Sequence, residues 1–177
     1  HSSKFIYDDQ YRIKEIWTFS AEKLHEKVIL TYKGKDLVKS EYIYLKDGEI
    51  VGVNTREYIK NGNMISWSAG VTIIEGEDEG EQTYKPTITL NNDGFVEKME
   101  EQLLGISAIS TFTYENGNLI KWVYDPIFSS TPNDPGERSY TYGINRSAYS
   151  GCNTPKWFMF LHFYEHASYN NVTGAAY

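Results

Sequence analysis

The amino-acid sequence predicts an all-β fold, a curved antiparallel meander of about ten strands in a partial barrel, with one C-terminal helix packed on the sheet. Three observations predict it. Asn-Gly and Asp-Gly turns recur along the chain, the runs beside them are rich in Tyr, Ile, Val, Trp and Thr, and one apolar segment near the C-terminus begins with a helix-start signal. We expect a single domain over residues 1–177.

The turns belong to an internal repeat. Residues 58–67 (YIKNGNMISW) closely match residues 114–122 (YENGNLIKW), and weaker copies are residues 44–50 (YLKDGEI) and 90–96 (LNNDGFV). Asn-Gly and Asp-Gly accept positive φ at both central positions of a two-residue hairpin turn, as that turn requires. Each copy is therefore predicted to form a β-hairpin.

Strands on both sides of each turn make up the predicted sheet. More degenerate copies of the repeat begin at Tyr7 and Tyr32. Strands joined by short turns pair with each other, which favours an antiparallel meander. The predicted strands are Arg12–Phe19, Val28–Tyr32, Leu37–Leu45, Ile50–Ile59, Met64–Ile74, Thr83–Leu90, Phe95–Glu100, Ser107–Tyr114, Leu119–Tyr124 and Arg138–Tyr142.

After the turns, apolar residues often stand three positions apart. In a flat strand such residues point to opposite faces. Either a β-bulge resets the register, or both faces are partly covered, and we favour a strongly curved sheet whose concave face is covered by another part of the chain. The pairs are Ile13 and Ile16, Ile50 and Val53, Met64 and Trp67, and Leu119 and Trp122.

The C-terminal apolar segment is predicted to be a helix over about residues 155–166. Thr154 is a suitable N-cap, Pro155 suits the first helical position, and Lys156 to His166 contain no Gly or Pro. The segment is apolar nearly all round, which is typical of a helix buried on several sides. A strand is the alternative, because aromatic residues also favour sheets.

Composition and charge narrow the classes of partner. The formal net charge of −7 gives little support to a nucleic-acid partner, since phosphate binding needs a basic surface. No apolar run approaches the length of about 18 residues that a membrane-spanning helix needs. The single cysteine, Cys152, excludes an intramolecular disulfide and a thiolate zinc cluster. We expect no cofactor.

The hairpin units resemble the tyrosine-aspartate repeats of bacterial surface proteins. More specifically, nearly the whole chain is similar to an uncharacterised family of secreted proteins of Gram-negative gut bacteria, described as a domain of unknown function with a porin-like fold. The resemblance rests on the hairpin units, on the Pro-containing loop from Asp125 to Gly136 and on Ser168 to Thr173 after the helix.

That resemblance implies an extracytoplasmic location, in the periplasm or at the cell surface. It also implies a signal peptide or lipid anchor, which we expect upstream of His1. It supplies no catalytic residues. The family's C-terminal hairpins after the helix are short or missing here, so closure of the barrel stays open.

Three tryptophans are the candidate ligand-binding residues of a non-enzymatic binding or interaction module. Trp67 and Trp122 each follow a turn Asn by six positions, and Trp157 lies in the predicted helix. Rows of aromatic side chains can stack on sugars or line a lipophilic groove, which predicts an apolar or glycan ligand, and a protein partner is the other possibility. Repeated aromatic residues also form cross-strand packing pairs, as in a purely structural surface protein.

One motif favours a different class, a metal-dependent hydrolase. His162, Glu165 and His166 fit the His-x-x-Glu-His pattern of inverted zinc peptidases, with Glu165 as general base. A third protein ligand is not apparent, and bulky aromatic residues crowd the helix. We therefore expect no metal and no catalytic residues, with these polar side chains facing solvent at a helix end.

An acidic, glycine-broken segment, Glu75 to Glu81, is predicted to be a solvated hairpin tip. Carboxylates can bind Ca²⁺, but the alternating ligand spacing and the terminal bidentate Glu of a known calcium loop are absent. Calcium binding by this segment stays an open alternative.

Overall fold

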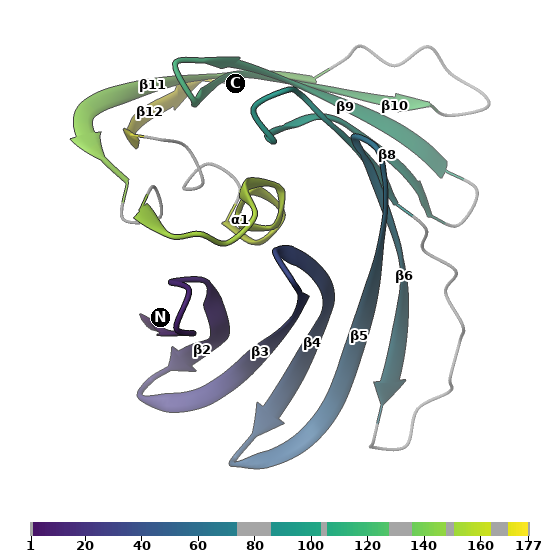
Figure 1. Ribbon diagram of the computed structural model, residues 1–177, viewed down its shortest axis with the longest axis vertical. Helices are drawn as coiled ribbons and strands as arrows, with labels where there is room; N and C mark the ends of the chain where they lie inside the picture. Colours follow the sequence, from purple (N-terminus) through teal and green to yellow (C-terminus); the bar gives the residue numbers. More distant parts are fainter. Residues whose placement is uncertain are drawn as a thin grey trace. The chain divides into compact units, whose positions relative to one another are not determined.

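A computed structural model describes residues 2–73, 86–103, 106–127, 136–147, 151–163 and 170–176. Over these residues the chain forms twelve strands and one helix. Hydrogen bonds join each strand to the next along the chain, from β1 to β12, without a crossover. Figure 1 shows β2, β3, β4 and β5 side by side. The predicted antiparallel meander with a single helix packed on it is confirmed.

The contacts divide the chain into two compact units, one of His1–Ile59 with Trp67–Thr83 and one of Lys60–Ser66 with Tyr84–Tyr177. The division crosses β5 and β6. The strands from the first half of the chain are β1 Ser2–Tyr7, β2 Ile13–Ser20, β3 Lys23–Lys33, β4 Asp36–Lys46, β5 Glu49–Asn61 and β6 Met64–Ile73. Those that follow are β7 Thr87–Leu90, β8 Val96–Leu103, β9 Ile106–Glu115, β10 Asn118–Ile127, β11 Gly136–Arg146, the helix α1 Lys156–Phe163 and β12 Asn170–Ala176.

Two strands, β1 and β12, were not among the predicted ones. The segment of β12, NNVTGAA, has two Asn and a Gly, residues that are depleted in strands, so its composition gives no strand signal. The segment of β1, SSKFIY, is short and begins with two serines. Pairing with a neighbour, β2 or β11, makes each of them a strand.

Every predicted turn that the structure describes lies between two paired strands. Asp47 and Gly48 have φ of 51° and 90°, and Asn116 and Gly117 have φ of 52° and 78°, as the two-residue turn requires. One turn has no such sequence signal. Ala21 and Glu22 both have positive φ, 47° and 65°, where β2 and β3 meet, although neither residue favours this conformation.

The three-residue spacing after the turns is explained by β-bulges. In the β1–β2 hairpin Ile6 pairs with Glu15 and Tyr7 with Ile13, so one extra residue lies between the two pairs. The strand that follows the turn carries such an extra residue at its second or third position in six hairpins. The extra residues are Lys14, His25, Val38, Val51, Glu97 and Ile120.

A bulge returns residues three apart to the same face of the strand. Ile13 and Ile16 are both fully buried. Val96 is also fully buried, and Met99 is only 6% exposed. Met64 and Trp67 are an exception, because Met64 is 45% exposed and Trp67 is buried. In β6 the buried residue before Trp67 is Ile65, two positions away, as in an ordinary strand.

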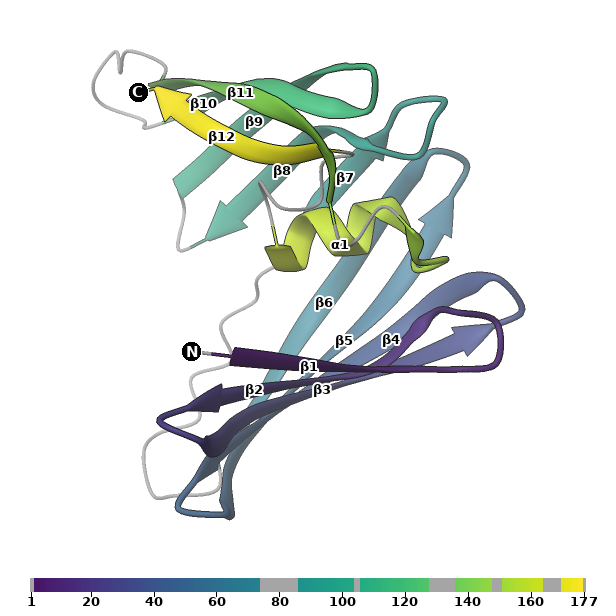
Figure 2. The same cartoon turned by 90° about the vertical axis from the view of Figure 1, so that its left-hand side faces the viewer.

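The helix α1 belongs to the second unit, where it contacts β8 (Figure 2). It starts directly after Thr154 and Pro155, as predicted, and its last described residue is Phe163. Four successive residues, Trp157 to Phe160, are buried, so the helix is covered on several sides. The ring of Phe160 lies 4.7 Å from that of Phe112 in β9, edge to face.

A polar contact fixes the start of the helix. Lys156 Nζ donates a hydrogen bond of 3.0 Å to the carbonyl oxygen of Asp93, in the β7–β8 turn, and lies 4.2 Å from the centre of the Phe95 ring. The turn itself is held by Asn91, whose Oδ1 accepts 3.0 Å hydrogen bonds from the backbone N–H groups of Asp93 and Phe95.

Candidate functional site

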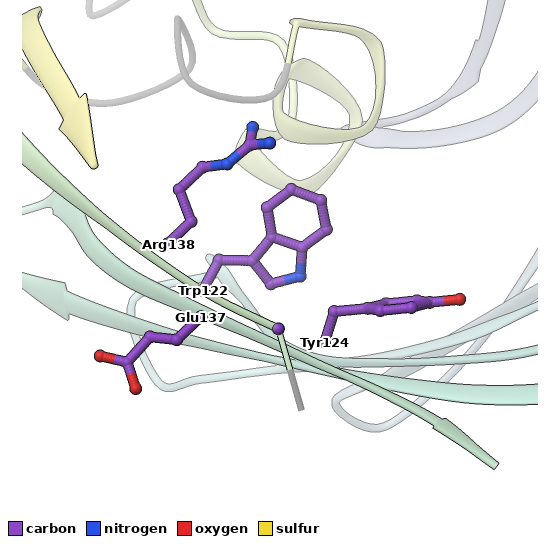
Figure 3. A pocket seen from close by; sticks show the side chains of 5 residues that line it. Trp122, Tyr124, Glu137 and Arg138 are labelled. Carbon is purple, nitrogen blue, oxygen red and sulfur yellow. The ribbon is translucent and has the colours of Figure 1, made fainter. Parts of the chain in front are cut away.

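A hollow of about 290 Å³ lies on the β10–β11 pair of the second unit. Figure 3 shows the side chains that line it. Most of its wall is apolar, and the lining residues are Trp122, Tyr124, Gly136, Glu137 and Arg138. The volume is near the lower end of ligand pockets, which is about 300 Å³.

The register of the two strands creates this hollow. Trp122 pairs with Arg138, and Tyr124 pairs with Gly136. Trp122 and Tyr124 are two positions apart on β10, so their side chains share one face of the sheet. Opposite Tyr124 stands a glycine, and a Cβ atom on Gly136 would meet only the Tyr124 carbonyl oxygen, at 4.0 Å. The missing side chain leaves open space between the two aromatic rings.

Trp122 is held in place from two sides. Its ring stacks on Phe112 of β9, with centroids 6.0 Å apart and an interplanar angle of 26°. The guanidinium carbon of Arg138 lies 5.1 Å from the centre of the Trp122 ring. Because Phe112 also contacts Phe160 of α1, an aromatic row leads from the helix to the hollow.

The two charged residues of the lining lie on opposite faces of β11. Figure 3 shows Arg138 beside the Trp122 ring and Glu137 pointing away from it. Glu137 forms an ion pair of 2.8 Å with Lys121, and both side chains are largely exposed. The charge that faces the hollow is therefore the positive charge of Arg138.

The other two candidate tryptophans lie in the core. Trp67 is 4% exposed and packs edge to face on Tyr58, with centroids 5.9 Å apart. Trp157 is 6% exposed and packs edge to face on Phe158 within α1. Of the three, Trp122 alone lines the hollow.

The histidine motif falls mostly outside the described residues. His162 lies in α1, where its ring stacks on Phe158 at 5.8 Å and meets Phe163 edge to face at 4.5 Å. Glu165 and His166 lie beyond the described part of the chain, and so does the acidic segment 75–81. Among the residues that the structure describes, no group of three His, Cys, Asp or Glu side chains could hold a metal ion. Cys152 is described and is partly buried.

Sequence reasoning did not single out Gly136 and Arg138. They follow residues 128–135, which lie outside the described part of the chain, and the sequence of these residues does not fix the register of the strand after them. Arg138 was placed at the start of a predicted strand, but its position opposite Trp122 needed the pairing of β10 with β11.

No helix of the described segments has the length and apolar character needed to cross a membrane. A scan against models of protein families finds no match for this chain, and a search of curated proteins finds none either.

Proposed function

We propose that this chain is a non-enzymatic binding module of a bacterial surface or periplasmic protein, and that it holds a sugar ring of a glycan in the hollow between Trp122 and Tyr124. The observation that carries the proposal is the hollow itself. It joins two aromatic side chains, the open space over Gly136 and the guanidinium of Arg138.

This combination suits a sugar better than a purely apolar ligand. A sugar ring has apolar C–H groups that pack on aromatic rings, and hydroxyl groups that accept hydrogen bonds from a guanidinium. A hollow of about 290 Å³ has room for one ring, so we expect recognition of a single terminal or branching residue.

The placement of the carboxylates supports a binding role over glycoside hydrolysis. Glycoside hydrolysis uses two carboxyl groups that flank the scissile bond. The one carboxylate of the lining, Glu137, points away from the hollow and is paired with Lys121. The extracytoplasmic location is supported by the resemblance of the hairpin units to those of exported proteins.

Direct binding measurements on a panel of oligosaccharides test the proposal, with intrinsic tryptophan fluorescence and calorimetry as readouts. Trp122→Ala and Gly136→Leu are expected to weaken binding about ten-fold or more, since the first removes the central aromatic contact and the second fills the space beside it. Gly136→Leu should fold normally, because the backbone there leaves room for a side chain.

Trp17→Ala is the matched control. Trp17 is another half-buried strand tryptophan, with Lys4 and Lys27 5.2 Å and 5.3 Å from its ring centre, but it does not line the hollow. It should leave glycan binding unchanged. Equal binding by Gly136→Leu and the parent would refute the site, and stoichiometric zinc lost on His162→Ala would favour the hydrolase instead.

A further inference from the structure

Two arginines of the first unit stack on tyrosines, and one of them has its charge neutralised. The guanidinium carbon of Arg12 lies 4.1 Å from the centre of the Tyr32 ring. Asp8 accepts a 2.8 Å hydrogen bond from Arg12 Nε and lies 2.7 Å from its terminal nitrogen. A further hydrogen bond runs from Arg12 to the Gly34 carbonyl oxygen. The charge of Arg12 is therefore paired and its guanidinium is hydrogen-bonded.

Arg56 of β5 has the same stacking without the neutralising partner. Its guanidinium carbon lies 4.4 Å from the centre of the Tyr42 ring. Its one hydrogen bond within the described part of the chain is a long one, 3.4 Å from a terminal nitrogen to the Tyr42 hydroxyl. Its Nε is shielded from solvent and has no hydrogen-bond partner there.

Such an arrangement is costly unless something else binds the cation. A guanidinium carries five N–H donors, and buried charges in proteins are as a rule paired and hydrogen-bonded. A donor left buried without an acceptor destabilises the folded protein, because it has lost its hydrogen bond to water. The Arg56 side chain as a whole is only partly buried, so a ligand can approach it.

A second unsatisfied group lies beside it. In the β4–β5 register Ser40 pairs with Arg56 and Tyr42 pairs with Asn54, so these four side chains share one face. Asn54 Oδ1 is also buried without a hydrogen-bond partner within the described residues. The face thus offers an unused donor on Arg56 and an unused acceptor on Asn54, two positions apart on one strand.

The nearby carboxyl group does not fill this place. Glu26 of β3 pairs with Tyr44 in the β3–β4 register. Burial raises the pKa of Glu26, against the opposing effects of the His25 and Arg56 charges. No ion pair joins Glu26 to Arg56 among the described residues.

We propose that Arg56 binds the carboxylate of a small ligand and that Asn54 accepts a hydrogen bond from a hydroxyl group next to that carboxylate. The ligand class is a hydroxy carboxylate, either a free α-hydroxy acid or the uronic acid residue of a glycan, whose nearest hydroxyl is on C4, the ring carbon next to the one that bears the carboxylate. The Tyr42 ring supports the guanidinium from one side, and its hydroxyl group accepts the 3.4 Å hydrogen bond from Arg56. This site lies in the first unit and does not depend on the hollow of the second.

Calorimetric titration of the Gly136→Leu variant, in which the hollow of the second unit is filled, with glycolate, acetate, glucuronate and glucose tests the proposal. Glycolate should bind this variant more tightly than acetate, because acetate has no hydroxyl for Asn54, and neutral glucose should not bind it. Glucuronate binding better than glycolate would assign the site to acidic glycans, and the reverse order would assign it to free hydroxy acids. No binding of either hydroxy carboxylate at millimolar concentration would overturn the proposal.

Two variants with a matched control locate the effect. Arg56→Gln should weaken glycolate binding about ten-fold or more, the usual loss when a charged hydrogen bond is removed. Arg12→Gln, which removes the paired arginine, should leave glycolate affinity unchanged. Gly136→Leu should leave it unchanged too, so failure of the glycan proposal and failure of this one are separable. Equal affinities of Arg56→Gln and the parent would refute the site.

Asn54→Asp supplies a readout that does not depend on ligand. It replaces the amide by a carboxylate of nearly the same shape beside Arg56, so the protein supplies the missing anion itself. The variant should melt at a higher temperature than the parent and should no longer bind glycolate. A lower melting temperature with unchanged glycolate binding would show that Arg56 needs no anion.

Discussion

The two best-matched copies of the repeated hairpin, residues 58–67 and 114–122, use the same residue types differently. Trp67 is 4% exposed and lies in the core, whereas Trp122 is half-buried and lines the hollow. The tyrosines that begin the copies differ as well. The Tyr58 hydroxyl lies 2.7 Å from Ser40 Oγ, but the buried Tyr114 hydroxyl has no hydrogen-bond partner within the described residues.

The two copies also differ by one residue in length. Two residues separate Tyr58 from its turn Asn, and one residue separates Tyr114 from its own. In the first copy β5 ends at Asn61 and β6 begins at Met64. In the second copy β9 ends at Glu115 and β10 begins at Asn118. The turn is therefore Gly62-Asn63 in one and Asn116-Gly117 in the other.

The shifted turn changes which of the first residues of the strand after the turn are buried. Met64 is exposed and Ile65 is buried in the first copy, while Leu119, which corresponds to Met64, is buried in the second. The repeat motif thus specifies a hairpin, and the length of the hairpin decides which of its side chains face the core.

The largest expected contrast is between the two tryptophans. Trp67→Ala should lower the free energy of unfolding by about 3–5 kcal/mol, because it leaves a cavity in the core. Trp122→Ala should cost about 1–2 kcal/mol, mainly the stacking on Phe112. Urea unfolding of both variants measures the difference, and equal losses would place the two residues in equivalent environments.

A smaller contrast is expected between the two tyrosines. Burial raises the pKa of both hydroxyls, so both are neutral over the ordinary pH range. Tyr58→Phe should cost about 1–1.5 kcal/mol, because Ser40 loses a buried hydrogen bond. Tyr114→Phe should be neutral or stabilising, because it removes a buried hydroxyl that has no partner. Chemical denaturation checks both, and a destabilised Tyr114→Phe protein would reveal a missing partner.

The smallest contrast concerns the turns. Asn116 has a φ of 52°, a region that Asn tolerates better than Ala, so Asn116→Ala should cost about 0.5–1 kcal/mol. Asn61 ends β5, so Asn61→Ala should cost only a few tenths. Thermal melts resolve this difference if both variants are compared with the parent in one buffer. A larger loss for Asn61→Ala would mean that the first turn also centres on its Asn.

Much of the fold could be predicted, because turn chemistry and strand composition are local properties. Asp47-Gly48 and Asn116-Gly117 favour the backbone conformation that their turns require, and Thr154-Pro155 marks the start of the helix. Strand β12 and the Ala21-Glu22 turn could not be predicted, since each depends on pairing with a neighbouring strand and not on its own residues.

The candidate sites were harder to predict because the register of paired strands brings their residues together. Trp122 could be singled out as an aromatic residue, but the glycine and the arginine beside it became visible only when β10 was aligned with β11. No local sequence pattern marks Arg56 as a candidate binding residue. Its lack of an ion-pair partner among the described residues depends on which side chains of β3 and β4 face it, and this follows from the strand pairing and not from the local sequence.

The extra residue in each returning strand also bears on how such a chain can evolve. In an ordinary sheet, inserting or deleting a single codon within a strand turns every later side chain to the wrong face. Here most hairpins already contain an unpaired residue near the turn, at positions such as Lys14 and Glu97. A length change can be absorbed there as a bulge gained or lost, before the central part of the strand is reached. The hairpins can therefore drift in length as well as in sequence, and a duplicated copy can acquire a new role through a single-codon change.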